Sequence, residues 1–215
     1  ICGICPVAYQ MSAVHAAEMA FGVNITAWTR NLRRLFYCGE WIQSHALHIH
    51  LLAAPDYFGC ESAVALSQHA PEIVRRGLKL QSIGNRIMRV VGGRSVHPIN
   101  TCPGGFYSAP AMAAIQELKQ EIAAAQQDAY ELARWVASLE MPDDQQDFIS
   151  VCLQHSDEYP FNEGRIIASN GLDIAIDEYE QHFRESHEAN STALYSWLDE
   201  KPSLVGPLAR VNLLH

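Results

Sequence analysis

The sequence contains few basic residues and no long apolar run. Lys and Arg together number 15 against 24 Asp and Glu, so the formal net charge of the 215 residues is −9. Nucleic-acid binding needs clustered Lys and Arg, and the one basic cluster, Arg30, Arg33 and Arg34, is explained more simply as one solvated or interface face of a helix. We therefore expect no nucleic-acid partner. No run approaches about 18 apolar residues, which excludes a membrane-spanning helix within these residues.

Cysteine is scarce for a disulfide-stabilised protein. Six cysteines in 215 residues do not suggest the scaffold of a small secreted domain, because a chain with 48% apolar residues can build a core without them. Four of the six stand alone and are interpreted as buried thiols: Cys38, Cys60, Cys102 and Cys152. This usage favours a reducing compartment.

The two ends of the sequence lack the features of natural termini. The chain begins Ile1-Cys2-Gly3 without an initiator Met, and it stops at Leu214-His215 without a tail-like composition. We interpret it as a fragment of a longer subunit that lacks both termini. The absence of a signal peptide is then uninformative.

Helix signals dominate residues 1–141. Apolar residues at three-to-four spacing, bounded by Pro, Asn or Gly, predict helices over residues 6–22, 24–54, 71–91 and 110–140. Asn24 is the predicted cap of the second helix, and Pro55 is predicted to end it. The first helix is apolar on most sides, so we expect it to be buried on most sides. The length of these helices indicates a long-helix bundle.

The pattern changes in residues 142–215. Asn170-Gly171 between two apolar runs predicts a hairpin near residues 165–176. A short helix over 177–188 and a strand over 192–197 are also predicted. The expected fold class is therefore mainly α with a smaller α+β part: a long-helix bundle over residues 1–141, and a small antiparallel sheet over residues 142–215.

The sharpest chemical feature is the pair Cys2-x-x-Cys5, which precedes Pro6 and the first helix. Two thiolates at this spacing can face one metal ion, and Gly3 lets the backbone between them turn tightly. Cys5 occupies the expected N-cap, where the helix dipole and free N–H groups favour a thiolate. Soft thiolates select zinc, nickel, copper(I) or iron.

Three interpretations of this pair compete. A thioredoxin-like redox pair needs a βαβ unit, which the sequence does not indicate. A structural zinc site needs two further ligands. No second Cys-x-x-Cys is present, and the candidate histidines are His15, His45, His48 and His50. In the third interpretation the pair is half of a four-thiolate site whose other half lies beyond residue 215.

The stretch Ile1-Cys2-Gly3-Ile4-Cys5-Pro6 closely resembles the N-terminal metal motif of the large subunit of nickel–iron hydrogenases. Further family-like stretches are Gly93-Arg94-Ser95-Val96-His97-Pro98 with Gly104-Gly105, Ser44-His45-Ala46-Leu47-His48 before Pro55-Asp56-Tyr57, Glu163-Gly164-Arg165 with Gly171-Leu172-Asp173, and Leu204-Val205-Gly206-Pro207-Leu208-Ala209-Arg210. The resemblance spans the chain. It is closest to the cytoplasmic group linked to NAD(P) or a deazaflavin, and within that group to the NADP-linked, sulfhydrogenase-like branch.

The resemblance implies a nickel–iron centre with four cysteine ligands, in which iron also carries carbon monoxide and cyanide. Cys2 would be a terminal nickel ligand, and Cys5 would bridge nickel and iron. The second cysteine pair, the proton-transfer carboxylate and the preceding Arg of the family are absent, so the fragment alone should be inactive. Tyr9 stands where many members carry a His that hydrogen-bonds the bridging sulfur. His97 either approaches the iron–sulfur cluster of a partner or forms a His-Pro turn between helices.

The implied activity is reversible oxidation of hydrogen to protons and electrons. The chain would have the fold of hydrogenase large subunits and would belong to a cytoplasmic complex. Electrons would pass through an iron–sulfur small subunit toward flavin- and NAD(P)-binding subunits. Those cofactors belong to partners, because no Gly-x-Gly-x-x-Gly occurs in this chain. Two alternatives stay open: a structural zinc protein, and a relative of the quinone-proximal subunit of respiratory complex I. The cysteine pair argues against the latter.

Overall fold

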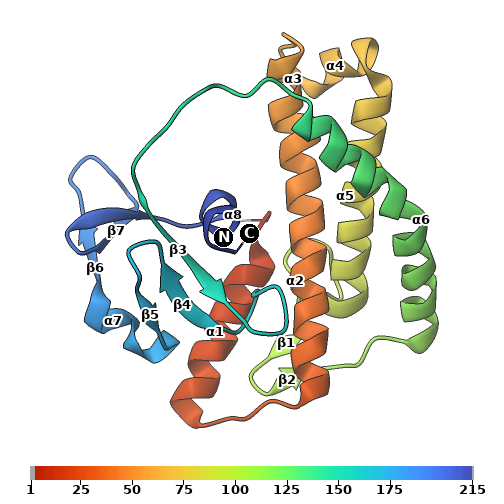
Figure 1. Cartoon of the computed structure of the whole chain (residues 1–215). Helices are drawn as coiled ribbons and strands as arrows, with labels where there is room; N and C mark the ends of the chain where they lie inside the picture. The colour runs from red at the N-terminus through yellow and green to blue at the C-terminus, as the bar shows by residue number, and fades with distance from the viewer. Residues whose placement is uncertain (1–2, 215) are drawn as a thin grey trace. The chain divides into compact units, whose positions relative to one another are not determined.

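The computed structural model describes residues 3–214, and the chain divides into two compact units between Met141 and Pro142 (Figure 1). The first unit is built mainly from long helices. Its elements are α1 (Pro6–Phe21), α2 (Ala27–Leu47), the π-helix η1 (His48–Ala53), α3 (Ala54–Tyr57), α4 (Ala63–His69), α5 (Pro71–Gly92), the short strands β1 (Thr101–Cys102) and β2 (Gly105–Phe106), and α6 (Met112–Ala137). No helix among residues 3–214 is both long and apolar enough to cross a membrane.

The predicted helices of the first unit are confirmed where Pro and Gly mark their ends. Pro6 and Pro71 lie in the first turns of α1 and α5, and Gly22 and Gly93 adopt left-handed C-cap conformations. The prediction that α1 is buried on most sides is wrong. Only a stripe that includes Val7 and Met11 is buried, and other apolar side chains of this helix are exposed.

The second helix differs from its prediction at both ends. Thr26, rather than Asn24, is the N-cap, and its hydroxyl accepts a hydrogen bond from the Thr29 N–H at 3.2 Å. At the other end the helix does not stop before Pro55. The wider turns of η1 intervene, and Pro55 lies in the first turn of α3, where a missing N–H costs no hydrogen bond. The short helix α4 was not predicted.

Helices α2 and α5 approach each other closely through glycines. A Cβ built on Gly84 would lie 2.4 Å from the backbone nitrogen of Gln43 and 2.6 Å from the carbonyl oxygen of Gly39. Gly39 in turn faces Ile87, whose Cγ2 would be 2.7 Å from a Cβ at that position. The separation of the two helix axes therefore depends on the absence of side chains at these two positions.

We predict that Gly84→Ala destabilises the protein by about 1–3 kcal/mol, although alanine favours helix formation. The added methyl group meets backbone atoms of α2, which cannot rotate away, so the two helices must separate. Urea unfolding of the purified protein measures the change. Ser82→Ala, at an exposed position of the same helix, should stay within about 0.5 kcal/mol of the unaltered protein. Equal stability of Gly84→Ala and Ser82→Ala would contradict the packing described.

A buried histidine joins η1 to α6. His50 is fully buried, and its ring stacks on Trp135 with the centroids 5.5 Å apart. The Arg76 guanidinium lies over the same tryptophan, 5.3 Å from its centroid. Neither ring nitrogen of His50 has a hydrogen-bond partner in the described part of the chain. Burial, assisted by the charge of Arg76, lowers the pKa of His50 to about 4.

This histidine predicts a loss of stability in mild acid. The folded pKa is about 4 and the ordinary value is 6.5, so between these pH values the unfolded chain binds a proton that the folded chain does not. Stability due to this group should therefore be complete above pH 6.5 and fall as the pH drops toward 4, by on the order of 3 kcal/mol. Unfolding measured from pH 7 to pH 4 tests this. His50→Phe, which retains an aromatic ring against Trp135, should flatten the profile; an unchanged slope would contradict the assignment.

The second unit contains a six-stranded sheet in the order β5-β4-β3-β8-β7-β6. Its elements are β3 (Ile149–Gln154), β4 (Arg165–Ala168), β5 (Asp173–Ile174), the 3-10 helix η2 (Ile176–Glu178), α7 (Tyr179–His182), β6 (Phe183–His187), β7 (Leu194–Leu198), β8 (Lys201–Leu204) and α8 (Pro207–Leu214). The β4–β5 hairpin and the β7 strand confirm two predictions. The predicted antiparallel sheet is confirmed only in part: β3 and β8 pair in parallel, so the sheet is mixed, while its other four pairings are antiparallel.

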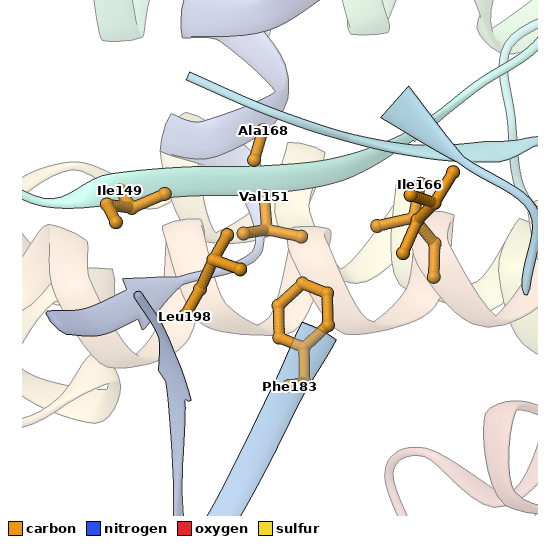
Figure 2. Packing of buried hydrophobic residues seen from close by; sticks show 7 residues of the cluster. Ile149, Val151, Ile166, Ala168, Phe183 and Leu198 are labelled. Atoms are coloured by element: carbon orange, nitrogen blue, oxygen red, sulfur yellow. The ribbon is translucent and has the colours of Figure 1, made fainter. Parts of the chain in front are cut away.

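The hydrophobic core of this unit explains one further correction. Figure 2 shows Val151, Ile166, Phe183 and Leu198 converging from four strands. Phe183 is 8% exposed and begins strand β6, which pairs with β7 where the sequence had predicted the end of a helix over 177–188. Burial of this ring and the pairing with β7 outweigh the local helix signal. The helical part is confined to η2 and α7.

Candidate metal centre

Cys5 lies at the start of α1, as the sequence predicted. It is the N-cap residue, half-buried, and its side chain makes no capping hydrogen bond. Pro6 follows at the first helical position, where its lack of an N–H leaves one fewer donor to satisfy. Cys2, the predicted terminal nickel ligand, lies outside the described residues, so the structure places one of the two thiol ligands.

The N–H groups at the start of α1 are bound by a residue of α2. The Glu40 carboxylate accepts hydrogen bonds from Val7 N–H and, at 3.1 Å, from Ala8 N–H. Only 3% of Glu40 is exposed. Burial raises the pKa of this carboxyl, and the two backbone hydrogen bonds lower it in part. The expectation that free N–H groups at this helix end stabilise the Cys5 thiolate is therefore wrong, because Glu40 occupies them.

A second residue of α2 binds the other side of the motif. The Gln43 side-chain amide donates to the Ile4 carbonyl oxygen at 2.8 Å, and 6% of Gln43 is exposed. Glu40 and Gln43 are three residues apart, so they project from the same side of α2. Together they bind the Ile4 carbonyl oxygen before Cys5 and the Val7 and Ala8 N–H groups that follow Pro6. Neither residue was predicted from the sequence; their polar character within a largely buried stretch of helix was the available signal.

The loop that carries His97 lies against the motif. A Cβ built on Gly3 would be 4.0 Å from His97 Nε2 and 3.5 Å from a methyl group of Val96. His97 has a φ of 49°, in the left-handed region. Gln10 donates to the Pro98 carbonyl oxygen at 2.6 Å, which fixes the loop to α1. The structure thus brings His97 to the metal motif.

The same loop is held on its other side by one buried amide. The Asn100 side chain donates to the carbonyl oxygens of Val91 and Ser108, both at 2.8 Å. Its oxygen accepts from the backbone N–H and the hydroxyl of Ser108. All the hydrogen-bonding capacity of this amide is used, so the loop has a defined path from α5 to the β1–β2 hairpin.

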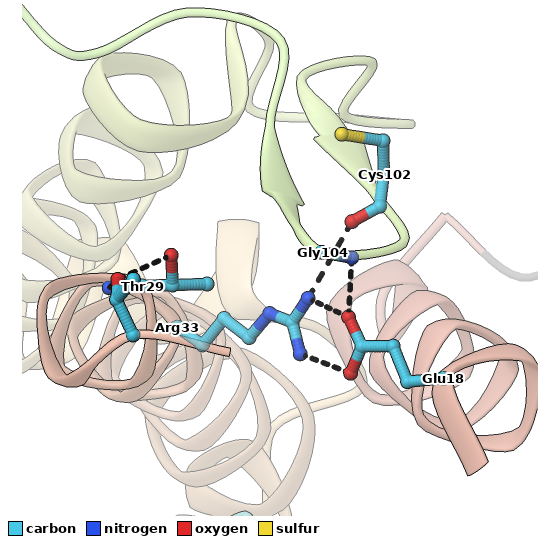
Figure 3. A network of polar contacts seen from close by, with 6 residues as sticks. Glu18, Thr29, Arg33, Cys102 and Gly104 are labelled. Atoms are coloured by element: carbon cyan, nitrogen blue, oxygen red, sulfur yellow. Dashed lines mark hydrogen bonds and ion pairs between the residues drawn. The ribbon is translucent and has the colours of Figure 1, made fainter. Parts of the chain in front are cut away.

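At the far end of α1 an ion pair ties three elements together (Figure 3). The Arg33 guanidinium donates to both carboxylate oxygens of Glu18, at 2.6 and 2.9 Å. Gly104 N–H donates to the same carboxylate at 2.6 Å, and Arg33 also reaches the Cys102 carbonyl oxygen at 3.4 Å. The hydrogen bond from Arg33 lowers the pKa of Glu18. Arg33, predicted as part of a solvated or interface face, is instead fully buried.

The other residues predicted from the sequence are Tyr9 and the candidate zinc ligands. Tyr9 is 65% exposed on α1, and its proposed hydrogen bond to a sulfur ligand stays a prediction. Among the candidate zinc ligands, His45 Nδ1 is 2.7 Å from the Trp41 carbonyl oxygen, and His50 is stacked on Trp135. Within residues 3–214 no three His, Cys, Asp or Glu side chains are grouped to hold a metal ion. The structural-zinc alternative therefore finds no site there.

The donor chemistry of the motif fits part of a nickel–iron centre. Cys5 offers a soft sulfur ligand at an ordered helix start, and the sequence places Cys2 three positions earlier, at a spacing suited to one metal. Two thiolates are half of the four that such a centre needs. The motif could thus hold the metals only together with sulfur ligands from outside these residues.

Comparison with known proteins points to one family. Residues 1–76 match the family model described as nickel-dependent hydrogenase. The alpha subunit of sulfhydrogenase 2 from Pyrococcus furiosus is 32% identical over 99% of this chain and 49% of its own length. In Methanocaldococcus jannaschii, one of the vhu subunits of the F420-non-reducing hydrogenase is 37% identical over 49% of this chain and 27% of its own length. The chain spans about half the length of the Pyrococcus relatives it matches.

A solved structure has the same fold. An NAD+-reducing NiFe hydrogenase in the H2-reduced state aligns with a TM-score of 0.80 at 23% identity, over 99% of this chain and 53% of that chain. The predicted likeness in fold to hydrogenase large subunits is consistent with this match. The relatives named here are hydrogenase subunits, and none of these findings favours the zinc or the complex I alternative.

Proposed function

We propose that this chain forms part of the catalytic subunit of a nickel–iron hydrogenase, because it is 32% identical over 99% of its length to the alpha subunit of sulfhydrogenase 2, and its residues 1–76 match the nickel-dependent hydrogenase family model. The reaction is the reversible conversion of hydrogen to protons and electrons. The observation that carries the proposal is the Cys2-x-x-Cys5 motif, which lies within the family-model match and has Cys5 at the N-cap of α1.

The residues of this chain have distinct parts in that chemistry. When bound, the nickel–iron group, with carbon monoxide and cyanide on iron, supplies the Lewis acid and electron acceptor that split hydrogen. Cys2 is assigned as a terminal nickel ligand whose sulfur can accept a proton. Cys5 is assigned as the ligand shared by both metals. The buried apolar stripe of α1 behind Cys5, which includes Val7 and Met11, excludes water from that side.

The cofactors that carry electrons to and from the centre are assigned to partner subunits. An iron–sulfur small subunit would receive the electrons, and flavin- and NAD(P)-binding subunits would pass them to the nucleotide in a cytoplasmic complex. The similarity to two sulfhydrogenase alpha subunits supports placing the chain in the sulfhydrogenase-like branch of the family. His97, which lies against Gly3, is assigned to the side that faces the iron–sulfur subunit. Tyr9 is assigned to the position from which a hydroxyl can reach a sulfur ligand.

The proposal is tested on the full-length complex, purified without oxygen. We expect nickel and iron in stoichiometric amounts by elemental analysis. We also expect reduction of a viologen dye and of NADP+ that depends on hydrogen. Stoichiometric zinc without nickel or iron would contradict the proposal. Dye reduction without NADP+ reduction would support the proposed hydrogenase activity but overturn NADP+ as the proposed electron acceptor.

A further inference from the structure

The first turn of α1 is capped from another helix. The donors there are few, because Pro6 has no N–H and the Tyr9 N–H already bonds to the Cys5 carbonyl oxygen at 3.4 Å. That leaves the N–H groups of Val7 and Ala8, and Glu40 accepts both. Helices usually satisfy such donors with a Ser, Thr, Asp or Asn side chain at the N-cap. Here the N-cap is a cysteine that makes no capping hydrogen bond.

The backbone on the other side of Cys5 is fixed by the same face of α2. Gln43 donates to the Ile4 carbonyl oxygen. The Ile4 carbonyl oxygen before Cys5, and the Val7 and Ala8 N–H groups after it, are thus bound to two side chains that are 6% and 3% exposed, respectively. The contacts join residues more than 30 positions apart, so they depend on the packing of α2 against α1 and not on local turn chemistry.

The position of these two side chains is itself constrained by α5. Gly84 of α5 lies against the backbone of Gln43, where even a methyl group would be 2.4 Å from the Gln43 nitrogen. Gly39, next to Glu40, faces Ile87 of α5 just as closely. The two side chains that bind the motif therefore project from a segment of α2 that is closely packed against α5.

We propose that Glu40 and Gln43 are positioning residues, which hold the segment 4–8 so that the Cys5 sulfur is presented to the metals in a fixed geometry before they bind. The inference rests on the proposed function for the identity of the metals. Because Glu40 provides the cap, the helix start is stable with a cysteine at a position that normally requires an oxygen acceptor. The cysteine side chain is thus not required as the cap of α1.

The test uses two variants and a matched control. Glu40→Gln keeps the volume but turns one acceptor oxygen into a donor group, which faces a backbone N–H. Gln43→Leu removes the donor to Ile4. The control is Glu18→Gln, which changes a similarly buried carboxylate that also accepts a backbone N–H, but at the opposite end of α1.

Two readouts separate positioning from general stability. In the full-length subunit purified without nickel, the alkylation rate of Cys5 by iodoacetamide is followed by peptide mass spectrometry. In the loaded complex, the infrared bands of the iron-bound carbon monoxide and cyanide report the geometry of the centre. We expect about tenfold faster alkylation of Cys5, and shifted or broadened bands, in Glu40→Gln and Gln43→Leu. Glu18→Gln should destabilise the opposite end of α1, because Arg33 loses its carboxylate partner, but at Cys5 it should match the unaltered protein in both readouts.

Each outcome decides the proposal. Unchanged alkylation and bands in both variants would overturn it, as would equal changes in Glu18→Gln, which would indicate general destabilisation. If Glu40→Gln does not fold, Gln43→Leu decides alone. Absence of nickel from the unaltered complex would instead overturn the proposed function. The alkylation rates would still decide whether Glu40 and Gln43 hold Cys5, because that readout needs no metal.

Discussion

Replacing Cys5 by Ser is expected to remove the proposed metal centre from the full-length protein. A serine hydroxyl is a hard donor that is protonated at neutral pH, whereas the assigned role requires a soft thiolate shared by two metals. Loss of residues that merely support a metal ligand costs about 10–100-fold in affinity or activity, so loss of the ligand should cost at least about 100-fold. Nickel content and hydrogen-dependent dye reduction measure the effect.

Two other cysteines serve as controls for this experiment. Cys38 lies on α2 and Cys152 on β3, and burial raises the pKa of both thiols, so neither has the character of a ready metal ligand. Cys38→Ala and Cys152→Ala should retain full nickel content. Full activity in Cys5→Ser would refute the assignment of Cys5 as a ligand. Loss of nickel in either alanine variant would show that nickel loss is not specific to removal of a cysteine of the motif.

The largest expected loss of stability comes from Glu18→Ala. The variant leaves the fully buried Arg33 guanidinium without its carboxylate partner and the Gly104 N–H without its acceptor. Breaking a buried pair by removing one partner typically costs about 3–5 kcal/mol, because a buried charge is left uncompensated. The ends of α1 and α2 and the β1–β2 hairpin should loosen together, since all three meet at this carboxylate. Urea unfolding of the purified protein measures the loss.

An exposed ion pair of the same unit provides the comparison. Arg86 donates to Glu117 at 2.9 Å, but the Glu117 side chain is 64% exposed. Glu117→Ala should therefore cost no more than about 1 kcal/mol. The Glu18 contribution should also have a pH dependence, because its folded pKa is lowered: it is present above the ordinary value of 4.5 and lost as the pH falls below it. A Glu18→Ala variant as stable as Glu117→Ala would contradict the buried network.

Local signals in the sequence were sufficient for much of the architecture. Pro6 and Gly22 delimit α1 because each has a conformational property that the helix end requires. Gly171, with a φ of 94°, supplies the turn between β4 and β5. These features act within a few residues, so they can be recognised without knowledge of the fold.

The structural features that the sequence did not predict depend on distant parts of the chain. The π-helix η1 places His50 against Trp135, about 85 residues away in sequence, and no local pattern indicates that stack. Strand β6 forms because Phe183 enters a core made by other strands. Position 24 offers a good capping residue, yet the helix begins after Thr26.

The candidate site likewise has one part that local sequence signals predict and another part that depends on distant residues. The spacing of Cys2 and Cys5, with Pro6 behind them, predicts a metal motif, and the structure places Cys5 at the start of α1. The residues that hold it, Glu40 and Gln43, bind its backbone from another helix, and side-chain hydrogen bonds over such sequence distances leave no periodic signal. The role of Gly84 depends on the packing of α5 against α2, which no local pattern in the sequence indicates.

Infrared spectroscopy of the full-length complex, matured and purified without oxygen, tests the central claim most directly. Carbon monoxide and cyanide bound to iron absorb in a region where protein does not. The proposal that Cys2 and Cys5 belong to a nickel–iron centre predicts these bands in the unaltered complex and their loss in Cys5→Ser. A nickel-loaded complex without such bands, or a Cys5→Ser complex that retains them, would contradict it.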